Sequence, residues 1–153
     1  MLEYKKISEV DSDKLLKFFS EIVENQDDIF FHPHAFDKET VEYICVNYKG
    51  KDLYYVIYLN FDIVGYGILR GWDEGYDIPS LGIILSKKIR GSRISKNFME
   101  FLHLVAKNKG SKSIRIKFNN KNIAIKSLAE KLGYSCKELN ESTSLGYFVF
   151  QNQ

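Results

Sequence analysis

A short basic turn around one glycine is the part of the sequence whose chemistry is easiest to name. The turn Lys87-Lys88-Ile89-Arg90-Gly91-Ser92-Arg93-Ile94-Ser95 follows the apolar run 81–85 and precedes a long amphipathic segment. Such a turn brings free backbone N–H groups, the positive end of a helix dipole and cationic side chains together, and this combination binds phosphates. Neither GxxxxGK[ST] nor GxGxxG occurs in the sequence. We therefore expect a pyrophosphate group at this turn.

Charge is divided unevenly along the chain. Residues 87–126 carry twelve Lys and Arg side chains against one acidic side chain, Glu100, although the net charge of the whole protein is only +2. This segment predicts contact with a polyanion, with ordinary solvent-exposed faces as the alternative. A nucleic-acid-binding module would interleave aromatic residues with the basic ones. Because Phe98, Phe101 and Phe118 fall at inward-facing positions, the pattern disfavours nucleic acid as the partner.

Length and composition narrow the class of protein. A chain of 153 residues with 44% hydrophobic residues fits one domain, 1–153, with a buried core, and it is neither disordered nor collagen-like. Its N-terminus lacks a secretion signal and no apolar run could cross a membrane, so we expect a cytoplasmic protein with no membrane partner. Cys45 and Cys136 belong to no CxxC motif or Cys/His cluster, so we expect neither a disulfide nor a metal.

Hydrophobic periodicity and turn residues predict strands and helices that alternate along the chain. Strands are expected at 2–7, 53–59, 63–70, 81–85, 114–118, 134–138 and 145–150. Helices are expected from 11 or 12 to about 23, from 37 to about 48, from 94 to 109 and from about 122 to 132. This order is typical of an α+β or α/β sheet with helices on both faces.

Three segments resemble the GNAT superfamily of acyl-CoA N-acyltransferases, and the order of elements also matches. The segments are Leu81-Gly82-Ile83-Ile84-Leu85, Arg90-Gly91-Ser92-Arg93-Ile94-Ser95 and Asn122-Ile123-Ala124-Ile125-Lys126-Ser127-Leu128-Ala129-Glu130-Lys131-Leu132-Gly133-Tyr134. The resemblance covers nearly the whole chain. It implies an α+β fold, α/β-like, in one GNAT-type domain. The implied sheet is central, mixed and mostly antiparallel, with about seven strands, a splayed fourth strand and helices on both faces.

The resemblance implies acetyl-CoA as the acyl donor. In that family the strand before the turn pairs with the pantetheine arm, which implicates Ile83 and Leu85 here, and Asn122 matches an Asn that contacts the same arm. The family turn R/Q-x-x-G-x-G/A wraps the pyrophosphate with its amides. It maps onto Arg90, Gly91, Ser92, Arg93, Ile94 and Ser95.

Two departures from the family pattern bear on function. Arg93 and Ser95 stand where the family turn has small residues, so the backbone approaches a phosphate less freely, although Arg93 can add a charge-assisted contact. Ala129 stands where many relatives carry the Tyr that protonates the leaving thiolate. A general acid must therefore come from elsewhere, such as a strand tyrosine, or water must serve.

Acetyl transfer to an amine needs a base, because the amine is mostly protonated at neutral pH and attacks only as the free amine. Asp77 and Glu74 lie in the loop 71–79 just before the expected splayed strand, and Asp77 is the nearer. His34 lies in the loop 26–36, which in the family borders the acceptor pocket. We expect Asp77 or His34 to act through water, with Glu74 in reserve and no single residue indispensable.

The same two loops supply the expected acceptor contacts. These are His32, Phe31, Trp72 and Asp73. The stretch 71–82 also looks like a GNAT branch found among enzymes of surface-sugar biosynthesis, which suggests an amino sugar or sugar nucleotide. The expected function is direct transfer of acetyl from acetyl-CoA to a primary amine of a small molecule, in a ternary complex. A homodimer is among the expected partners. The alternatives are an acyl-CoA-binding sensor without turnover and, less favoured, the nucleic-acid-binding module.

Overall fold

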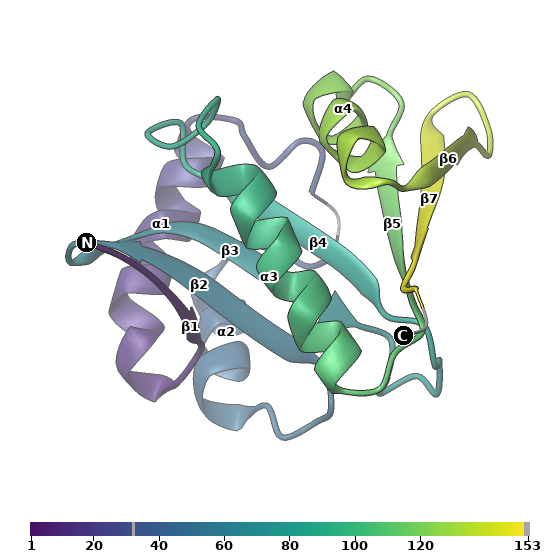
Figure 1. Ribbon diagram of the computed structural model, residues 1–153. Coiled ribbons are helices and arrows are strands. Elements are labelled where there is room, and N and C mark those ends of the chain that lie inside the picture. Colours follow the sequence, from purple (N-terminus) through teal and green to yellow (C-terminus); the bar gives the residue numbers. More distant parts are fainter. Residues whose placement is uncertain (32, 152–153) are drawn as a thin grey trace.

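One sheet of seven strands organises the computed structural model, which describes residues 1–31 and 33–151 (Figure 1). The strands are β1 (Leu2–Lys6), β2 (Leu53–Leu59), β3 (Asp62–Arg70), β4 (Ser80–Leu85), β5 (Ser113–Asn119), β6 (Ser135–Glu138) and β7 (Thr143–Val149). Their spatial order is β1-β2-β3-β4-β5-β7-β6, and within the described residues β4 and β5 are the only parallel neighbours. The predicted mixed, mostly antiparallel sheet of seven strands is confirmed.

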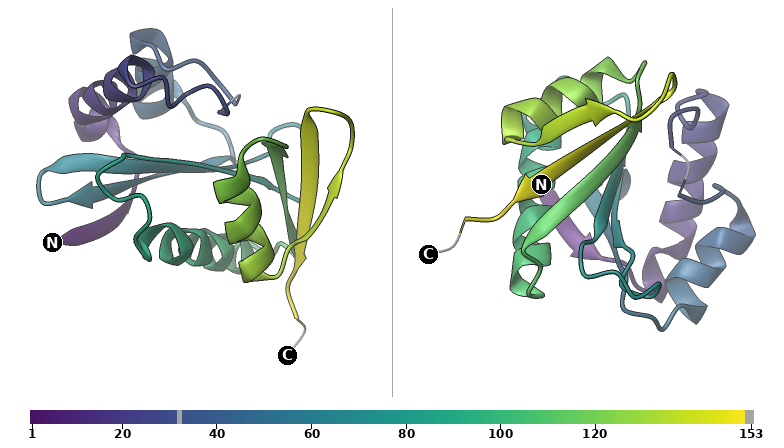
Figure 2. Two further views of the ribbon diagram at one scale, coloured as in Figure 1. Left: turned by 90° about the horizontal axis from the view of Figure 1, so that it is seen from above. Right: turned by 90° about the vertical axis from the view of Figure 1, so that its right-hand side faces the viewer.

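Helices cover both faces of the sheet, as predicted. Figure 2 shows α1 (Ser12–Glu24) and α2 (Lys38–Glu42) on one face and α3 (Ile94–Asn108) on the other, with α4 (Ile123–Leu132) beside the β5–β7 end. The helix predicted from Asp37 to about Tyr48 is present over residues 38–47, but its second half is not α-helical. After α2 the chain forms a π-helical stretch, η2 (Tyr43–Asn47), because the N–H of Tyr48 bonds the Tyr43 carbonyl at 2.7 Å instead of a carbonyl one residue closer.

Two apolar layers hold these helices against the sheet. Helix α1 carries Leu15, Phe18, Phe19 and Ile22 at the spacing of one helical face. All four side chains are buried between α1 and the sheet. Helix α3 packs closely on β3. A Cβ on Gly67 would lie 2.7 Å from the Phe98 ring, so a glycine at this position allows the approach. The core therefore fixes the position of α3, whose N-terminus follows β4 by the basic turn.

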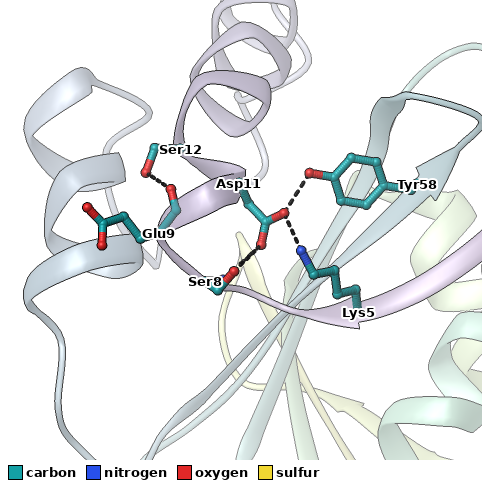
Figure 3. A network of polar contacts seen from close by, with 6 residues as sticks. All are labelled: Lys5, Ser8, Glu9, Asp11, Ser12 and Tyr58. Carbon is teal, nitrogen blue, oxygen red and sulfur yellow. Dashed lines mark hydrogen bonds and ion pairs between the residues drawn. The ribbon is translucent and has the colours of Figure 1, made fainter.

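Asp11 ties the start of α1 to two strands (Figure 3). Its carboxylate is 1% exposed and accepts hydrogen bonds from Lys5 Nζ at 2.8 Å, Tyr58 Oη at 2.6 Å and the Ser8 N–H at 2.8 Å. Burial acts to raise the pKa of Asp11, but the hydrogen bonds from Lys5, Tyr58 and Ser8 outweigh it and hold that pKa below its usual value. A short 3₁₀ turn, η1 (Glu9–Asp11), leads from this anchor into α1.

Candidate active site

β4 and β5 separate soon after they begin, and a cleft lies between them. In the described chain their parallel pairing joins only Ser80 to Arg115 and Leu81 to Ile116, and Figure 1 shows the strands diverging beyond that point. The cleft has a volume of about 570 Å³. Small-molecule sites usually enclose about 300–1,000 Å³, so this cleft can hold a ligand of that class.

Four residues singled out from the sequence line this cleft: Phe31, Glu74, Ile83 and Asn122. They come from the loop after α1, the loop after β3, the middle of β4 and the start of α4. Elements far apart in the chain thus meet at one place because the sheet order sets β3, β4 and β5 side by side.

The basic turn leaves backbone N–H groups open at the start of α3. Arg93 caps the helix with no side-chain hydrogen bond, and the N–H groups of Ser95 and Lys96 have no hydrogen-bond acceptor among residues 1–31 and 33–151. Gly91 has φ +75°, a left-handed conformation that glycine adopts without steric cost. Free amides, the helix dipole and the surrounding cationic side chains are the features that bind phosphate.

Arg90 is held by the protein itself. Its Nη2 forms an ion pair with Asp27 at 3.0 Å, and its Nε and Nη2 donate to the Leu85 carbonyl at 3.2 and 3.1 Å. These contacts fix the turn onto the end of β4. Leu85 is only 8% exposed and is not among the residues that line the cleft, unlike Ile83. The roles of Arg90 and Leu85 toward a cofactor stay predictions.

Asn122 both caps α4 and lines the cleft. Its side-chain oxygen accepts the N–H of Ile125 at 3.3 Å, which satisfies one of the open donors at the helix start. Because the oxygen serves the helix, the amide NH₂ is the group left for a ligand. Ile125 lies next to it on the wall of the same cleft.

The loop after β3 is shaped by hydrogen bonds that place Glu74 and Tyr76 at the cleft. The Gly71 carbonyl accepts the N–H groups of Glu74 at 3.2 Å and Tyr76 at 3.0 Å, and Asp52 accepts the N–H of Gly71 at 3.0 Å. Asp77, the carboxylate nearest to the strand in sequence, does not line the cleft, although Asp77 and Glu74 are both exposed. Of the loop acids, Glu74 is therefore the one positioned to meet a ligand there.

His34 has both ring nitrogens engaged. Its Nδ1 lies 2.8 Å from the Ala35 carbonyl and must donate to it, so Nε2, 2.7 Å from Tyr66 Oη, accepts the Tyr66 hydroxyl proton in the neutral ring. Burial lowers the pKa of His34 and favours this neutral form. His34 does not line the cleft, and His32, the other histidine expected at the acceptor site, lies outside the described residues.

Trp72 and Asp73 are engaged away from the cleft. The Trp72 ring lies under Lys109 Nζ at 4.0 Å, near the end of α3. The Asp73 carboxylate accepts the Lys51 N–H at 2.7 Å and the Tyr48 hydroxyl, and these bonds, led by that of Lys51, hold the pKa of Asp73 below its usual value. Neither side chain lines the cleft, and the role of Trp72 and Asp73 in binding the acceptor stays a prediction.

A tyrosine that was not singled out from the sequence lines the cleft. Ala129 is fully buried in the core, so the usual tyrosine has no counterpart on α4. Tyr66 is fully buried and Tyr58 is bonded to Asp11, which removes two of the strand tyrosines. Tyr76 lines the cleft instead, and only its place in the same loop as Glu74 could have indicated it.

Within residues 1–31 and 33–151, no group of three or more His, Cys, Asp or Glu side chains could hold a metal ion. No helix in the same ranges is long and apolar enough to cross a membrane.

Solved GNAT acetyltransferases are similar to this chain over nearly its whole length. The GNAT domain of S. lividans PAT is 12% identical with a TM-score of 0.82, and 97% of this chain and 90% of that chain are covered. A ribosomal-protein-alanine N-acetyltransferase from Brucella melitensis is 16% identical with a TM-score of 0.78, with 97% and 99% covered. The microcin C7 self-immunity acetyltransferase MccE, solved with acetyl-CoA and AMP, is 16% identical with a TM-score of 0.77, with 97% and 92% covered.

These similarities establish the fold of the chain. No protein-family model and no curated protein sequence matches it. The agreement with the solved structures over nearly the whole chain shows that the chain has the GNAT acetyltransferase fold, and the fold predicted from the sequence is confirmed. Because a fold can host several functions, the activity must be argued from the cleft itself.

Proposed function

We propose that the protein is an N-acetyltransferase that transfers the acetyl group of acetyl-CoA directly to a primary amine. The observation that carries this proposal is the cleft between the diverging strands β4 and β5, of about 570 Å³. The turn with open N–H groups follows β4 directly. A long ligand with phosphates at one end and a reactive group at the other fits this arrangement.

Acetyl-CoA would be bound by three parts of the chain. The N–H groups of Ser95 and Lys96 and the left-handed turn at Gly91 receive the pyrophosphate. The edge of β4 at Ile83, which has no strand partner on the β5 side in the described chain, runs beside the pantetheine. The amide NH₂ of Asn122 donates to the same arm from the opposite wall.

Glu74 is the proposed base. Its carboxylate lines the cleft and can take a proton, directly or through water, from the ammonium form of the acceptor. The free amine then attacks the thioester carbonyl, and the nitrogen of the adduct gives its extra proton to water as the C–S bond breaks, which leaves the amide and the CoA thiolate. Tyr76 and Ser80 line the cleft and carry hydroxyl groups, and one of these side chains or water returns a proton to the thiolate.

The proposed acceptor is a primary amine on a small molecule, for which an amino sugar or sugar nucleotide is the first candidate from the sequence. Solved proteins of the same fold include acetyltransferases named for ribosomal protein and for microcin, so peptide amines belong in any acceptor panel. A sensor that binds acetyl-CoA without turnover is the second candidate, favoured by Ala129 at the usual tyrosine position.

The test is turnover of purified protein with acetyl-CoA and a panel of amino sugars, amino acids, polyamines and peptide N-termini. We expect release of the CoA thiol and acetylation of at least one primary amine, identified by mass spectrometry. Binding of acetyl-CoA with no acetylation across the panel would favour the sensor. Failure to bind acetyl-CoA at millimolar concentration would reject both candidates.

A further inference from the structure

Two arginines that were not among the predicted site residues line the cleft near the start of β4. The strand register pairs Arg70 of β3 with Ser80 of β4, and Ser80 with Arg115 of β5. Residues directly opposite one another on neighbouring strands project from the same face of a sheet. Arg70 and Arg115 therefore flank Ser80 on one face, with their Cα atoms on the order of 10 Å apart, and all three residues line the cleft.

Both guanidinium groups are held in place by the protein. Arg70 Nη1 donates to the Pro33 carbonyl at 2.7 Å, and Arg115 Nε donates to Ser80 Oγ at 3.0 Å. The Arg115 guanidinium also lies 5.6 Å from the centre of the Tyr76 ring. Each side chain is half-buried and keeps further N–H donors that these contacts do not use.

The positive charge of this pair is uncompensated. Within residues 1–31 and 33–151, neither Arg70 nor Arg115 forms an ion pair with a carboxylate, whereas Arg90 pairs with Asp27. Lys117 lines the same cleft and adds a third positive charge. Half-buried guanidinium groups with open donors are a favourable site for a carboxylate or phosphate, which they bind through paired hydrogen bonds.

We infer that the amine acceptor carries an anionic group, a carboxylate or a phosphate, which Arg70 and Arg115 bind. This inference rests on the proposed acetyl transfer. The phosphates of acetyl-CoA belong to the turn after Leu85, whereas the arginines flank Ser80 at the other end of β4, about 17 Å away along the strand. Glu74 lines the same cleft and attracts the ammonium. The site therefore suits a small molecule that carries a positive amine and a negative group.

A binding experiment tests this without knowledge of the natural acceptor. Isotope-labelled protein saturated with acetyl-CoA is titrated with inorganic phosphate and, separately, with acetate, and the side-chain Nε–H signals of the arginines are followed by NMR. We expect at least one of these anions to shift the Arg70 and Arg115 signals together and saturably. Arg115→Gln should lower the affinity for that anion about tenfold or more. Lys137→Gln is the control, because it removes an exposed charge on β6, and it should leave the affinity unchanged.

Matched acceptor pairs provide the kinetic arm. Each pair has the same amine with and without the anion: an amino acid and its amide, and glucosamine 6-phosphate and glucosamine. We expect kcat/KM to favour the anionic member of one pair about 10- to 100-fold, and Arg115→Gln or Arg70→Gln to remove most of that preference. The pair that responds distinguishes carboxylate from phosphate.

The results separate the two proposals. No anion-dependent shift of either arginine, or equal kcat/KM within every pair that is turned over, would overturn the anionic acceptor even if acetyl transfer is observed. Absence of acetyl-CoA binding would instead overturn the proposed function, and the anion titration can still be read on the free protein. Arg70→Lys and Arg115→Lys, which keep the charge and lose the planar fork, serve where the Gln variants melt early.

Discussion

Glu74 and Asp77 lie in one loop three residues apart, yet only Glu74 lines the cleft between β4 and β5. The Gly71 carbonyl accepts the N–H groups of Glu74 and Tyr76, and this turn directs the first part of the loop toward the cleft. Asp77 follows the turn and does not line the cleft. Position along the chain favoured Asp77 as the base, whereas the folded loop favours Glu74.

Replacing Glu74 by Gln tests this choice of base. We expect kcat for the acceptor found in the amine panel to fall about 10²- to 10⁴-fold, because the isosteric amide cannot take the proton. Acetyl-CoA affinity should stay unchanged. Asp77→Asn is the matched control, since it removes a charge from the same loop outside the cleft, and it should leave kcat within about twofold. Similar kcat values for Glu74→Gln and the wild type would remove Glu74 from the mechanism.

Asn122→Asp separates the capping role of Asn122 from its role in the cleft. Aspartate keeps the oxygen that accepts the Ile125 N–H, so the melting temperature should hold. The NH₂ donor is lost and a negative charge enters the cleft, so we expect the KM for acetyl-CoA to rise about tenfold or more. Asn122→Ala should in addition cost about 1 kcal/mol of stability. A loss of stability in Asn122→Asp with unchanged KM would leave Asn122 as a cap alone.

His103 should make stability depend on pH. It is 7% exposed, its Nε2 lies 2.7 Å from Tyr134 Oη, and burial lowers its pKa from 6.5 to about 4. As pH falls below about 6.5, His103 gains a proton in the unfolded chain but stays neutral in the folded protein. The free energy of unfolding therefore decreases until about pH 4. The total loss is on the order of 3 kcal/mol.

Comparison of wild type with His103→Gln separates the contribution of His103 from that of the carboxylates, which titrate over part of the same pH range. The free energy of unfolding, measured by urea denaturation from pH 7.5 to pH 4, should fall less steeply in the variant. Parallel curves for the two proteins would show that His103 gains its proton equally in both states.

Asp11 should contribute far more to the free energy of unfolding than an exposed acidic residue does. Asp11→Ala leaves the Tyr58 hydroxyl and the Lys5 ammonium without their shared partner, and we expect a loss of about 3 kcal/mol. The matched control is Asp62→Ala, because Asp62 is half-exposed and forms ion pairs with lysines at 3.7 Å, each worth under about 1 kcal/mol. Equal melting temperatures for the two variants would contradict the role assigned to Asp11.

The pKa of Asp11 also fixes the direction of its pH dependence. Because the folded pKa lies below the usual value of 3.8, its contribution is complete above that pH and is lost as pH falls through the folded pKa. The stability difference between wild type and Asp11→Ala should therefore shrink in acid below about pH 4.

Local patterns were sufficient to predict the elements, but not the contacts between them. The spacing of Leu15, Phe18, Phe19 and Ile22 correctly predicted α1 and its buried face. The partner of Arg90 could not be predicted, because Asp27 is brought to it only by the packing of α1 beside the sheet. A basic residue after a strand and before a glycine reads equally as a phosphate ligand and as an anchor for the turn.

The arginine pair was missed for a similar reason. Arg70 and Arg115 each read as an exposed strand residue, and their relation through Ser80 depends on the register of three strands. For Trp72, its place in a polar loop predicted an acceptor contact but could not predict the packing of its ring under Lys109 at the end of α3. Which face a loop side chain joins is decided by the tertiary fold and not by its neighbours in sequence.

Calorimetric titration of acetyl-CoA into wild type, Gly91→Ala and Gly110→Ala tests the central claim most directly. Both glycines flank α3 with positive φ, +75° and +100°, and a Cβ would meet nothing within 4 Å at either, so each alanine adds only backbone strain of about 1–2 kcal/mol. We expect similar losses in melting temperature but weaker acetyl-CoA binding, about tenfold, in Gly91→Ala alone. Absence of binding by the wild type, or equal affinity in all three proteins, would contradict an acetyl-CoA site at this turn.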